Sequence, residues 1–505
     1  MTDERRGRGT EHEESPESRF TTDQDPLADV VEPETELLEH EPASATVLTE
    51  EGPDLSVLDV RPSPGQPREY RFPPFERTLL ASGLTVVTCH MPGRPLLAAS
   101  LLLPGGGSTE PVEQAGVSVL MSRALTEGTQ RLDAIEFIEA SERLGAEIHA
   151  DTTWDASVVS LEVPRSRFGP AIGLLAEMLL EPAFPAPEVD RLREERINDL
   201  LQARADPRRR AERVFAETIF DPSVAYGRPL GGSEATVPGL DREAVLSRHR
   251  ALLGVPGATL VVAGDVDGLD VPALAREHLG GWAIADGEVT VPPAAEHAAG
   301  PRTVLVNKRS APQSEVRIGH LGLPRRTADF HAVSVLNAVL GGTFDSRLNR
   351  LLREDRGYTY SISSSFEMRR ARGPFAIRTA VHSETTVPAL LDAMSVVRGV
   401  REAELEQREL STARDYLVGV FPLRFESPAQ VCAALSGLVI QQLPDDELDR
   451  YRPAIAAVTG GEVLAAAQRH IHPDELSIVV VGDAATLESQ LRHSDLPPLQ
   501  TVLDE

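Results

Sequence analysis

The sequence predicts an α+β protein built from two similar α/β domains, and three observations support this. Short apolar segments bounded by Gly and Pro, typical of strands, alternate with longer segments whose apolar residues recur at helical spacing. The segment VSVL at 117–120 recurs at 333–336, and VVAGDVDG at 261–268 recurs as VVVGDAAT at 479–486. Because the two offsets, 216 and 218, are nearly equal and the elements keep their order, they indicate a duplicated domain rather than a short solenoid repeat.

Composition narrows the classes of function. A chain of 505 residues is too long for one ordinary domain, and its net charge of -28 argues against binding to nucleic acid. Cys89 and Cys432 are far apart without a C-x-x-C partner, so we expect no disulfide framework and a reducing compartment. The charged N-terminus has no apolar leader region, and no apolar run is long enough to cross a bilayer. We therefore expect a cytoplasmic protein without a membrane partner.

The composition changes near residue 70. Residues 1–70 carry 19 acidic residues against 6 Arg, with few aromatic side chains. Such a segment buries too little apolar surface to offset its chain entropy, so we expect a disordered acidic extension over 1–72. An arm that docks a partner is the alternative. We place the N-terminal domain at 73–285, a linker of Pro, Ala and Gly at 286–302, and the C-terminal domain at 303–505.

The elements of the first domain follow from local pattern. Apolar runs at 80–91 and 95–107 predict two strands, and an alternating stretch at 147–163 predicts a strand pair. The segment ATLVVAG at 258–264 predicts another buried strand. Apolar residues at helical spacing predict helices over 117–124, 133–144 and 188–205.

Three stretches carry a resemblance to a known family. They are PGGGSTEPVEQAGVSVLMSRALTEGT at 104–129, the segment from GRPLGGSEAT to VVAGDVD at 227–267, and GGTFDSRLNRLLREDRGYTYS at 341–361. Over about 75–500 the chain resembles the M16 (pitrilysin or insulinase-like) peptidases, in particular the M16B type that includes mitochondrial processing peptidase. The resemblance implies the LuxS/processing-peptidase-like metallohydrolase fold, in which two chains close as a clam-shaped dimer around a chamber.

The resemblance also implies a zinc-binding H-x-x-E-H motif, which this chain lacks. The two His positions hold Val119 and Arg123, the position of the general base holds Ser122, and the downstream ligand position holds Asp199. Val has no donor atom, Arg cannot be deprotonated to bind a metal, and Ser is no general base unaided. We therefore expect no cofactor in this chain. We expect Arg123 and Asp199 to form a buried pair where zinc would lie; the alternative is that both are solvated and unpaired.

A second part of the family's chemistry is retained. In M16 peptidases an Arg and a Tyr seven residues later reach over the zinc, and Arg353 and Tyr360 match that spacing. We expect a helix over 346–355 that Gly357 ends, with Tyr360 at the start of a strand. A guanidinium and a phenol are both hydrogen-bond donors, as an oxyanion requires. The alternative is a salt-bridged surface Arg and an ordinary strand Tyr.

The family resemblance further implies an edge strand that pairs with extended peptide. It corresponds here to 146–157, with His149, Ala150, Asp151 and Thr152 at its centre. An ordinary core strand is the alternative.

These expectations together describe a non-catalytic subunit. The resemblance implies that an M16B partner with an intact H-x-x-E-H motif would hold the zinc, while this chain contributes Arg353 and Tyr360 in trans and helps to bind the peptide. The alternative is a structural or peptide-binding scaffold with no role in proteolysis.

Overall fold

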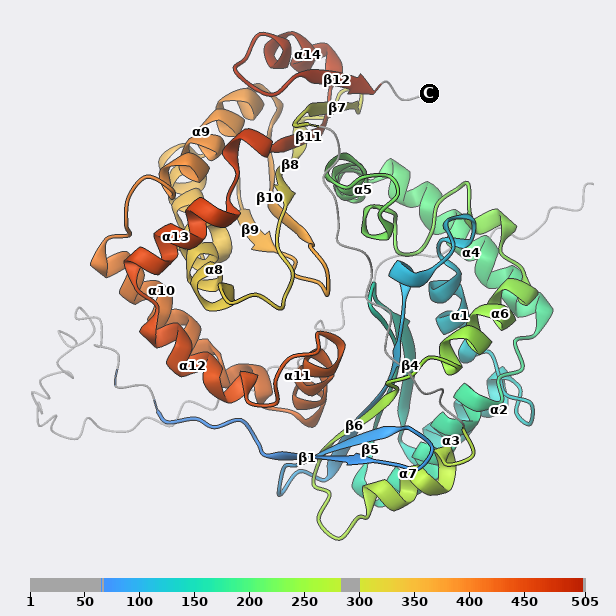
Figure 1. The fold of residues 1–505 in the computed structure, drawn as a ribbon. Coiled ribbons are helices and arrows are strands. Elements are labelled where there is room, and N and C mark those ends of the chain that lie inside the picture. The colour runs from blue at the N-terminus through green and yellow to red at the C-terminus, as the bar shows by residue number, and fades with distance from the viewer. Residues whose placement is uncertain (1–64, 66–67, 283–299, 503–505) are drawn as a thin grey trace, which may run out of the picture. The chain divides into compact units, whose positions relative to one another are not determined.

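The computed structural model describes residue 65, residues 68–282 and residues 300–502 (Figure 1). The predicted acidic extension lies outside the described residues except at its C-terminal end, and so does the predicted linker up to residue 299. No helix in the described ranges is long and apolar enough to span a bilayer.

A six-stranded mixed sheet forms the centre of the first half, with strand order β1-β2-β6-β3-β5-β4. Its strands are β1 (Phe75–Leu79), β2 (Thr85–His90), β3 (Leu96–Pro104), β4 (Glu147–Thr152), β5 (Ala156–Pro164) and β6 (Thr259–Gly264). Its helices are α1 (Val117–Leu125), α2 (Ala134–Leu144), α3 (Phe168–Leu180), α4 (Ala186–Ala205), α5 (Pro207–Ile219), α6 (Arg242–Leu253) and α7 (Val271–Leu279). The predicted strands and helices of this half are thus confirmed to within a few residues at their ends.

A second six-stranded sheet has the order β12-β7-β11-β8-β10-β9. Its strands are β7 (Thr303–Asn307), β8 (Gln313–Leu321), β9 (Ile362–Phe366), β10 (Pro374–His382), β11 (Ser477–Gly482) and β12 (Leu499–Val502). Its helices are α8 (Phe330–Asn337), α9 (Thr386–Gly399), α10 (Gln407–Val420), α11 (Pro428–Ile440), α12 (Glu447–Ala457), α13 (Gly460–His470) and α14 (Ala484–Arg492).

The two sheets repeat one topology. The series β2-β6-β3-β5-β4 in the first corresponds to β7-β11-β8-β10-β9 in the second, with a parallel first pair and antiparallel pairs thereafter. The outer strand differs, because β1 is antiparallel to β2 whereas β12 is parallel to β7. The fold class predicted from the repeated segments, two similar α/β domains, is therefore confirmed.

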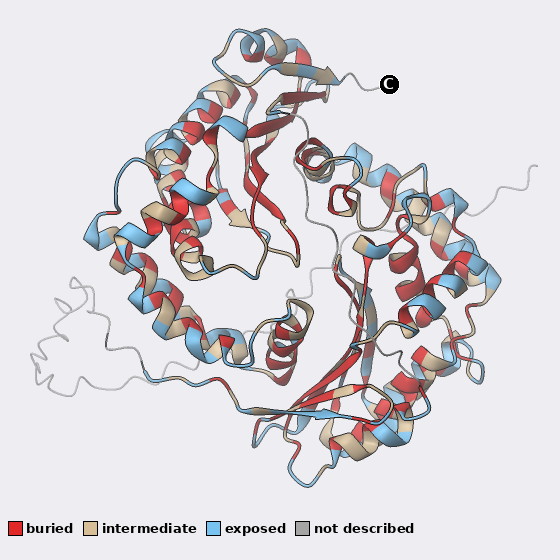
Figure 2. Ribbon diagram, viewed as in Figure 1, coloured by how far each residue is buried: buried red, intermediate tan, exposed pale blue. Residues whose placement is uncertain are grey.

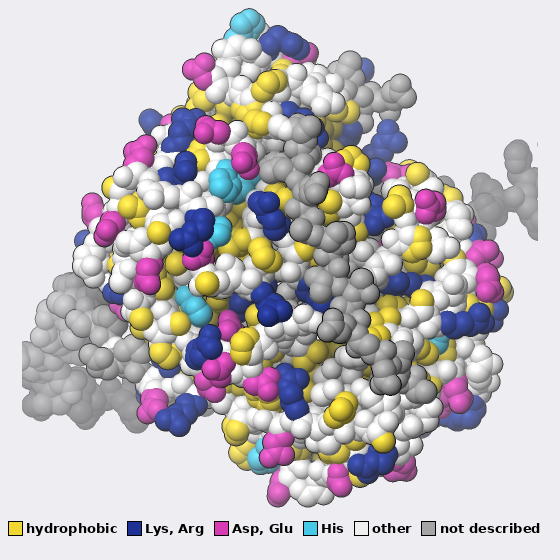
Figure 3. Space-filling view, in the orientation of Figure 1, with side chains coloured by type: hydrophobic (Ala, Val, Ile, Leu, Met, Phe, Trp, Pro, Cys, Tyr) yellow, Lys and Arg dark blue, Asp and Glu magenta, His cyan; other side chains and the backbone are white. Residues whose placement is uncertain are grey.

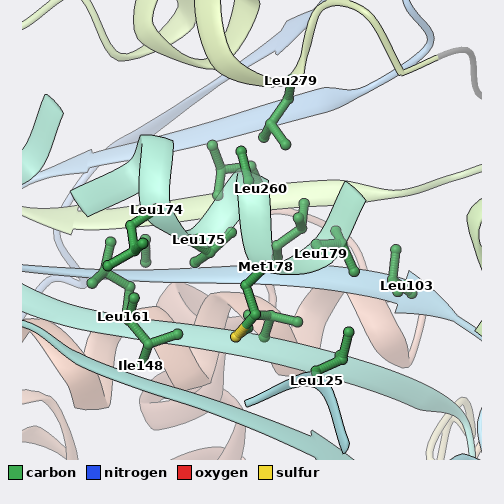
Figure 4. Close-up of a cluster of buried hydrophobic side chains, with 14 of the residues drawn as sticks. Leu103, Leu125, Ile148, Leu161, Leu174, Leu175, Met178, Leu179, Leu260 and Leu279 are labelled. Atoms are coloured by element: carbon green, nitrogen blue, oxygen red, sulfur yellow. The ribbon is translucent and has the colours of Figure 1, made fainter. Parts of the chain in front are cut away.

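Helices cover one face of each sheet with side chains of the same half. In the first half, Leu174, Leu175, Met178 and Leu179 of α3 lie over strand side chains such as Leu161 (Figure 4). Buried residues follow the strands and the inward faces of the helices (Figure 2). Each sheet therefore has its own apolar core, as a layered α/β architecture requires.

The other face of each sheet is covered by a helix from the opposite half. Ala211, Phe215 and Ile219 of α5 pack on the second sheet, in one cluster with side chains of β7, β8, β10 and β11. In the reverse direction, side chains of α11, including Cys432, pack on β2, β3 and β6 of the first sheet. The exchange buries the second face of both sheets. Cys89 and Cys432 are both free thiols within this second cluster, and burial raises the pKa of Cys89 to about 11 and that of Cys432 to about 12.

Candidate functional site

The helix that corresponds to the zinc-binding helix is α1, and a buried carboxylate holds its N-terminus. Glu110 accepts hydrogen bonds from the backbone N–H of Gly116 at 2.8 Å and of Ser118 at 2.6 Å. The carboxylate accepts hydrogen bonds from N–H groups that have no partner within the helix, and its negative charge is attracted to the positive end of the helix dipole. Gly116 has a φ of 99°, and a Cβ on it would lie 2.8 Å from the backbone of Gly231 and Gly232. This turn therefore requires glycine for two reasons.

A buried arginine joins α1 to the Gly-rich turn before it. Arg248 of α6 donates to Ser118 Oγ at 2.8 Å, to the Gly106 carbonyl at 2.9 Å and to Thr109 Oγ1 at 2.8 Å. Burial lowers the pKa of Arg248, and the nearby Glu110 opposes that shift. The frame of α1 is thus held by polar contacts from the side chains of Glu110 and Arg248.

The motif positions on α1 do not suit a metal. Val119 presents an aliphatic side chain that is partly buried, and Ser122 is buried with its Oγ 2.8 Å from Thr152 Oγ1. Thr152 in turn donates to the Ser118 carbonyl at 3.1 Å, so the Ser122 hydroxyl belongs to a closed hydrogen-bond network. In the described residues, no group of three or more His, Cys, Asp or Glu side chains is arranged to hold a metal ion. The chemistry of the residues present therefore does not fit zinc.

Arg123 finds its closest partner one turn away from the predicted one. Its Nη2 donates to Glu195 Oε2 at 3.0 Å, whereas Nη1 lies 3.9 Å from Asp199 Oδ2. Arg123 and Asp199 thus form an ion pair without a hydrogen bond. The expectation that the pair is buried is wrong, because their side chains are 38% and 48% exposed. Glu195 and Asp199 share a face of α4 at i and i+4, and the longer Glu reaches α1 more directly.

The contact between α1 and α4 extends into a chain of alternating charges. Glu195 also binds Arg191 at 2.5 Å, and Arg191 binds Glu127, just after α1, at 2.7 Å. Hydrogen bonds to Glu188 first, then to Glu127 and Glu195, raise the pKa of Arg191 above its usual value. The guanidinium of Arg123 is consequently occupied by carboxylates of its own chain.

In the second half, Arg353 and Tyr360 come together as predicted. The guanidinium carbon of Arg353 lies 5.5 Å from the centroid of the Tyr360 ring. Arg353 belongs to a π-helical segment, Asn349–Asp355, which Leu348 and Leu352 anchor in the core. Gly357, with a φ of 64°, ends the helix as predicted. Two details differ from the expectation: the segment is a π-helix, and Tyr360 precedes β9 by two residues instead of starting it.

The neighbouring Arg and Tyr are committed elsewhere. Arg356 donates to Asp392 at 3.1 Å, and Tyr358 is half-buried against the second core. Tyr360, by contrast, is 87% exposed. Among the described residues, Arg353 makes no ion pair or hydrogen bond with a side chain.

The residue that sequence reasoning missed is Phe344. Its ring centroid lies 4.3 Å from the guanidinium carbon of Arg353, and the residue is 62% exposed. A single Phe in the polar turn TFDS gives no periodic signal, because only the folded chain brings it to Arg353.

A polar hollow of about 510 Å³ adjoins Tyr360. Arg317 and Arg378 line it, and both donate to Glu212 of α5, at 2.7 and 2.9 Å. Burial alone would raise the pKa of Glu212, but the two guanidinium groups outweigh it and lower the pKa. Arg317 and Arg378 are therefore both paired with a carboxylate. On the face seen in Figure 3, basic and acidic side chains are likewise interspersed.

The predicted substrate strand, β4, lies at an edge of the first sheet, and in the described part of the chain β5 is the one strand that pairs with it. His149 and Asp151 are exposed, while Ala150 packs against the core. Thr152 turns its hydroxyl to α1, as described above. The strand thus offers a backbone edge and two outward side chains.

Comparison with known proteins agrees with this fold. Residues 85–225 match the family model for insulinase (peptidase family M16), and residues 239–417 match that for the peptidase M16 inactive domain. A protein of Mycobacterium tuberculosis named an uncharacterized zinc protease is 26% identical over 437 residues, covering 86% of this chain and 99% of the relative. A Helicobacter pylori protein named the non-peptidase homolog YmxG is 24% identical, covering 66% of this chain and 76% of the relative.

Solved structures share the fold. A peptidase M16 inactive domain from Pseudomonas fluorescens aligns with a TM-score of 0.74 at 24% identity, covering 81% of this chain and 98% of that one. A protease from Helicobacter pylori aligns with a TM-score of 0.76 at 17% identity, covering 82% of this chain and all of the other.

The repeated α/β halves define a metallopeptidase-like protein, and α1 carries no zinc-binding side chain at its motif positions. The chain belongs to peptidase family M16. Because Val119, Ser122 and Arg123 replace the metal-binding and basic groups, it is an inactive homologue of the peptidases.

Proposed function

We propose that this chain is the non-catalytic subunit of a heterodimeric M16 zinc endopeptidase. The partner would be a second chain of the family with an intact H-x-x-E-H motif, and the zinc would belong to that partner. This chain would contribute Arg353 and Tyr360 to the partner's site and help to hold the peptide substrate.

One observation carries the proposal: Arg353 and Tyr360 meet with their donor groups available. Tyr360 is 87% exposed, and no carboxylate among the described residues neutralises Arg353. A residue kept only for fold stability would more usually be paired, as Arg356 is with Asp392. Donors that lie beside each other without an acidic partner suit an oxygen that gains negative charge during peptide hydrolysis.

The chemistry assigned to these two residues is donation. The guanidinium has five N–H donors and stays protonated at neutral pH, and the phenol donates one O–H. Aimed at the carbonyl oxygen of the scissile bond, they would stabilise the charge that develops as that bond is attacked. Neither residue takes up a proton, so the general base for hydrolysis would belong to the partner's H-x-x-E-H motif.

A second function is favoured by β4, which has an unpaired backbone edge. A scaffold that binds extended peptide by strand addition needs only that edge and no catalytic partner. In this case Arg353 and Tyr360 would have no effect on peptide hydrolysis.

Reconstitution distinguishes the two functions. This chain, an M16 chain with an intact H-x-x-E-H motif from the same source genome, and an equimolar mixture are each assayed with a quenched-fluorescent peptide library. The proposal expects little cleavage by either chain alone and strong cleavage by the mixture, with the two chains eluting as one complex. Full activity of the H-x-x-E-H chain alone, unchanged by addition of this chain, would contradict it and favour the scaffold.

A further inference from the structure

Arg353 is held differently from Arg317, Arg378 and Arg356. Arg317 and Arg378 direct their N–H groups to carboxylates, and Arg356 does the same with Asp392. Arg353 instead lies beside two aromatic rings, with its guanidinium carbon 4.3 Å from the Phe344 centroid and 5.5 Å from the Tyr360 centroid. Attraction between a cation and the face of a ring fixes a guanidinium without consuming its N–H donors.

The loop that carries Phe344 is firmly attached. It joins two π-helical segments, Ala338–Gly342 and Asn349–Asp355. Thr343, directly before Phe344, donates through Oγ1 to the Ala338 carbonyl at 2.9 Å. The Thr343 carbonyl accepts from the backbone N–H of Ser346 at 3.2 Å and from Asn349 Nδ2 at 3.3 Å. π-helical turns are rare and recur at functional sites.

The exposure of Phe344 has no explanation in core packing. With 62% of its surface exposed, the ring contributes little to the apolar core, and a polar residue in its place would suit water better. Its distinctive contact is the one with Arg353. Tyr360 cannot replace it, because its ring is farther from the guanidinium and its phenol has its own role in the proposed function.

We propose that Phe344 is a positioning residue, which holds the guanidinium of Arg353 by a cation–π contact with its N–H groups free for the substrate carbonyl. The inference rests on the proposed function for its catalytic consequence. The positioning itself is a property of this chain and can be measured without a partner.

The first experiment uses the isolated full chain. Spectra of arginine Nε–Hε groups are recorded by NMR, and Arg353→Ala identifies the Arg353 signal by its disappearance. A ring face at this distance shifts that signal upfield. We expect Phe344→Ala and Phe344→Leu to reduce the shift to the part caused by the Tyr360 ring, and Phe344→Trp to keep it. A signal unmoved by Phe344→Ala would overturn the proposal, whatever the outcome of the activity assays.

The second experiment measures kcat and KM of the reconstituted complex with a peptide that the mixture cleaves. A cation–π contact at an exposed site predicts that Phe344→Ala lowers kcat by about fivefold with little change in KM. Phe344→Leu should resemble Ala, and Phe344→Trp should restore kcat to within about twofold of the original chain. Leu423→Ala serves as the matched control, because Leu423 is similarly exposed, at 61%, and lies outside the site.

The combination of both substitutions gives the sharpest result. If Phe344 acts through Arg353, then Phe344→Ala has no further effect on kcat in a chain that already carries Arg353→Ala. An equal loss in both backgrounds would mean an independent role and would overturn the proposal. If Arg353→Ala alone leaves kcat unchanged, the proposed function fails, while the NMR experiment still decides whether Phe344 positions the guanidinium.

Discussion

Two arginines stand at positions where M16 peptidases carry their chemistry, and their surroundings are opposite. Arg123, in place of a zinc-binding His, donates to Glu195 at 3.0 Å and is continuous with a chain of ion pairs between α1 and α4. Arg353 has two aromatic rings beside it and no acidic partner among the described residues. The first guanidinium is already satisfied by its own chain, and the second is available to a ligand. Under the proposed function, this difference separates the zinc-site position on α1, which ion pairs of the chain occupy, from the Arg353 position, which a substrate could reach.

The largest effect is expected from Arg353→Ala in the reconstituted complex. Loss of a donor to the developing oxyanion should lower kcat/KM by about 100-fold, which equals about 2.7 kcal/mol of transition-state stabilisation. Initial rates at several peptide concentrations measure it. Arg356→Ala is the control, since Arg356 binds Asp392 and should leave the rate unchanged. Equal losses from both variants would contradict the distinction between an open and a closed arginine.

A third arginine, the buried Arg317, forms an ion pair with Glu212 of α5. The variant Glu212→Gln tests what this pair contributes to stability. Gln keeps an acceptor oxygen but loses the charge that faces Arg317 at 2.7 Å, while Glu315 stays 3.1 Å from Arg317; the free energy of unfolding should fall by about 2 kcal/mol at pH 7. Urea denaturation followed by circular dichroism measures the change, and Glu217→Gln on the same helix is the control.

The same pair predicts a pH dependence. Because the pKa of Glu212 is lowered in the folded chain, its stabilisation is fully present above the unfolded pKa of about 4.3 and is lost as pH falls through the folded value. The stability difference between the original chain and Glu212→Gln should therefore shrink below about pH 4. A difference that stays constant from pH 7 to pH 3 would exclude this role for the charge.

Tyr360→Phe should have a smaller effect than Arg353→Ala. It removes one hydroxyl and keeps the ring near Arg353, so kcat should fall by about tenfold, or about 1.4 kcal/mol, without loss of assembly. Steady-state kinetics and size-exclusion chromatography of the complex are the measurements. Tyr416→Phe, another exposed Tyr at 48%, should be neutral. A rise in KM with kcat unchanged would assign Tyr360 to substrate binding alone.

The smallest effect is expected from Arg123→Ala. Ion pairs with exposed partners contribute little, so the free energy of unfolding should fall by less than about 1 kcal/mol. Thermal denaturation measures it.

The same measurement with and without a chelator tests the metal site. Because the residues on α1 do not fit zinc, the chelator should leave the melting temperature of the original chain unchanged. A fall of several degrees on chelation would show that this chain binds a structural metal elsewhere.

Several features of the site could be predicted from the sequence because they depend on spacing. The absence of the H-x-x-E-H motif, the helix over 117–124 and the seven-residue spacing of Arg353 and Tyr360 are all local, and each was found without a structure. The choice of Glu195 over Asp199 was missed, because both lie on one face of α4 and only the approach of α1 decides between them. Phe344 was missed for a similar reason, because its proposed role depends on a contact with Arg353, nine residues further along the chain, that only folding creates.

By itself, the sequence determined the duplicated α/β class, the strands β2 to β6 with the helices α1, α2 and α4 of the first half, and the lack of metal-binding groups on α1, because repeats, periodicity and side-chain chemistry are local properties. Only the tertiary structure decided the reciprocal exchange of α5 and α11, the ion pairs that close α1 against α4 and the ring that holds Arg353. These depend on distances between segments far apart in the chain. Whether an arginine is occupied by a carboxylate or left open beside an aromatic ring is set by such distances.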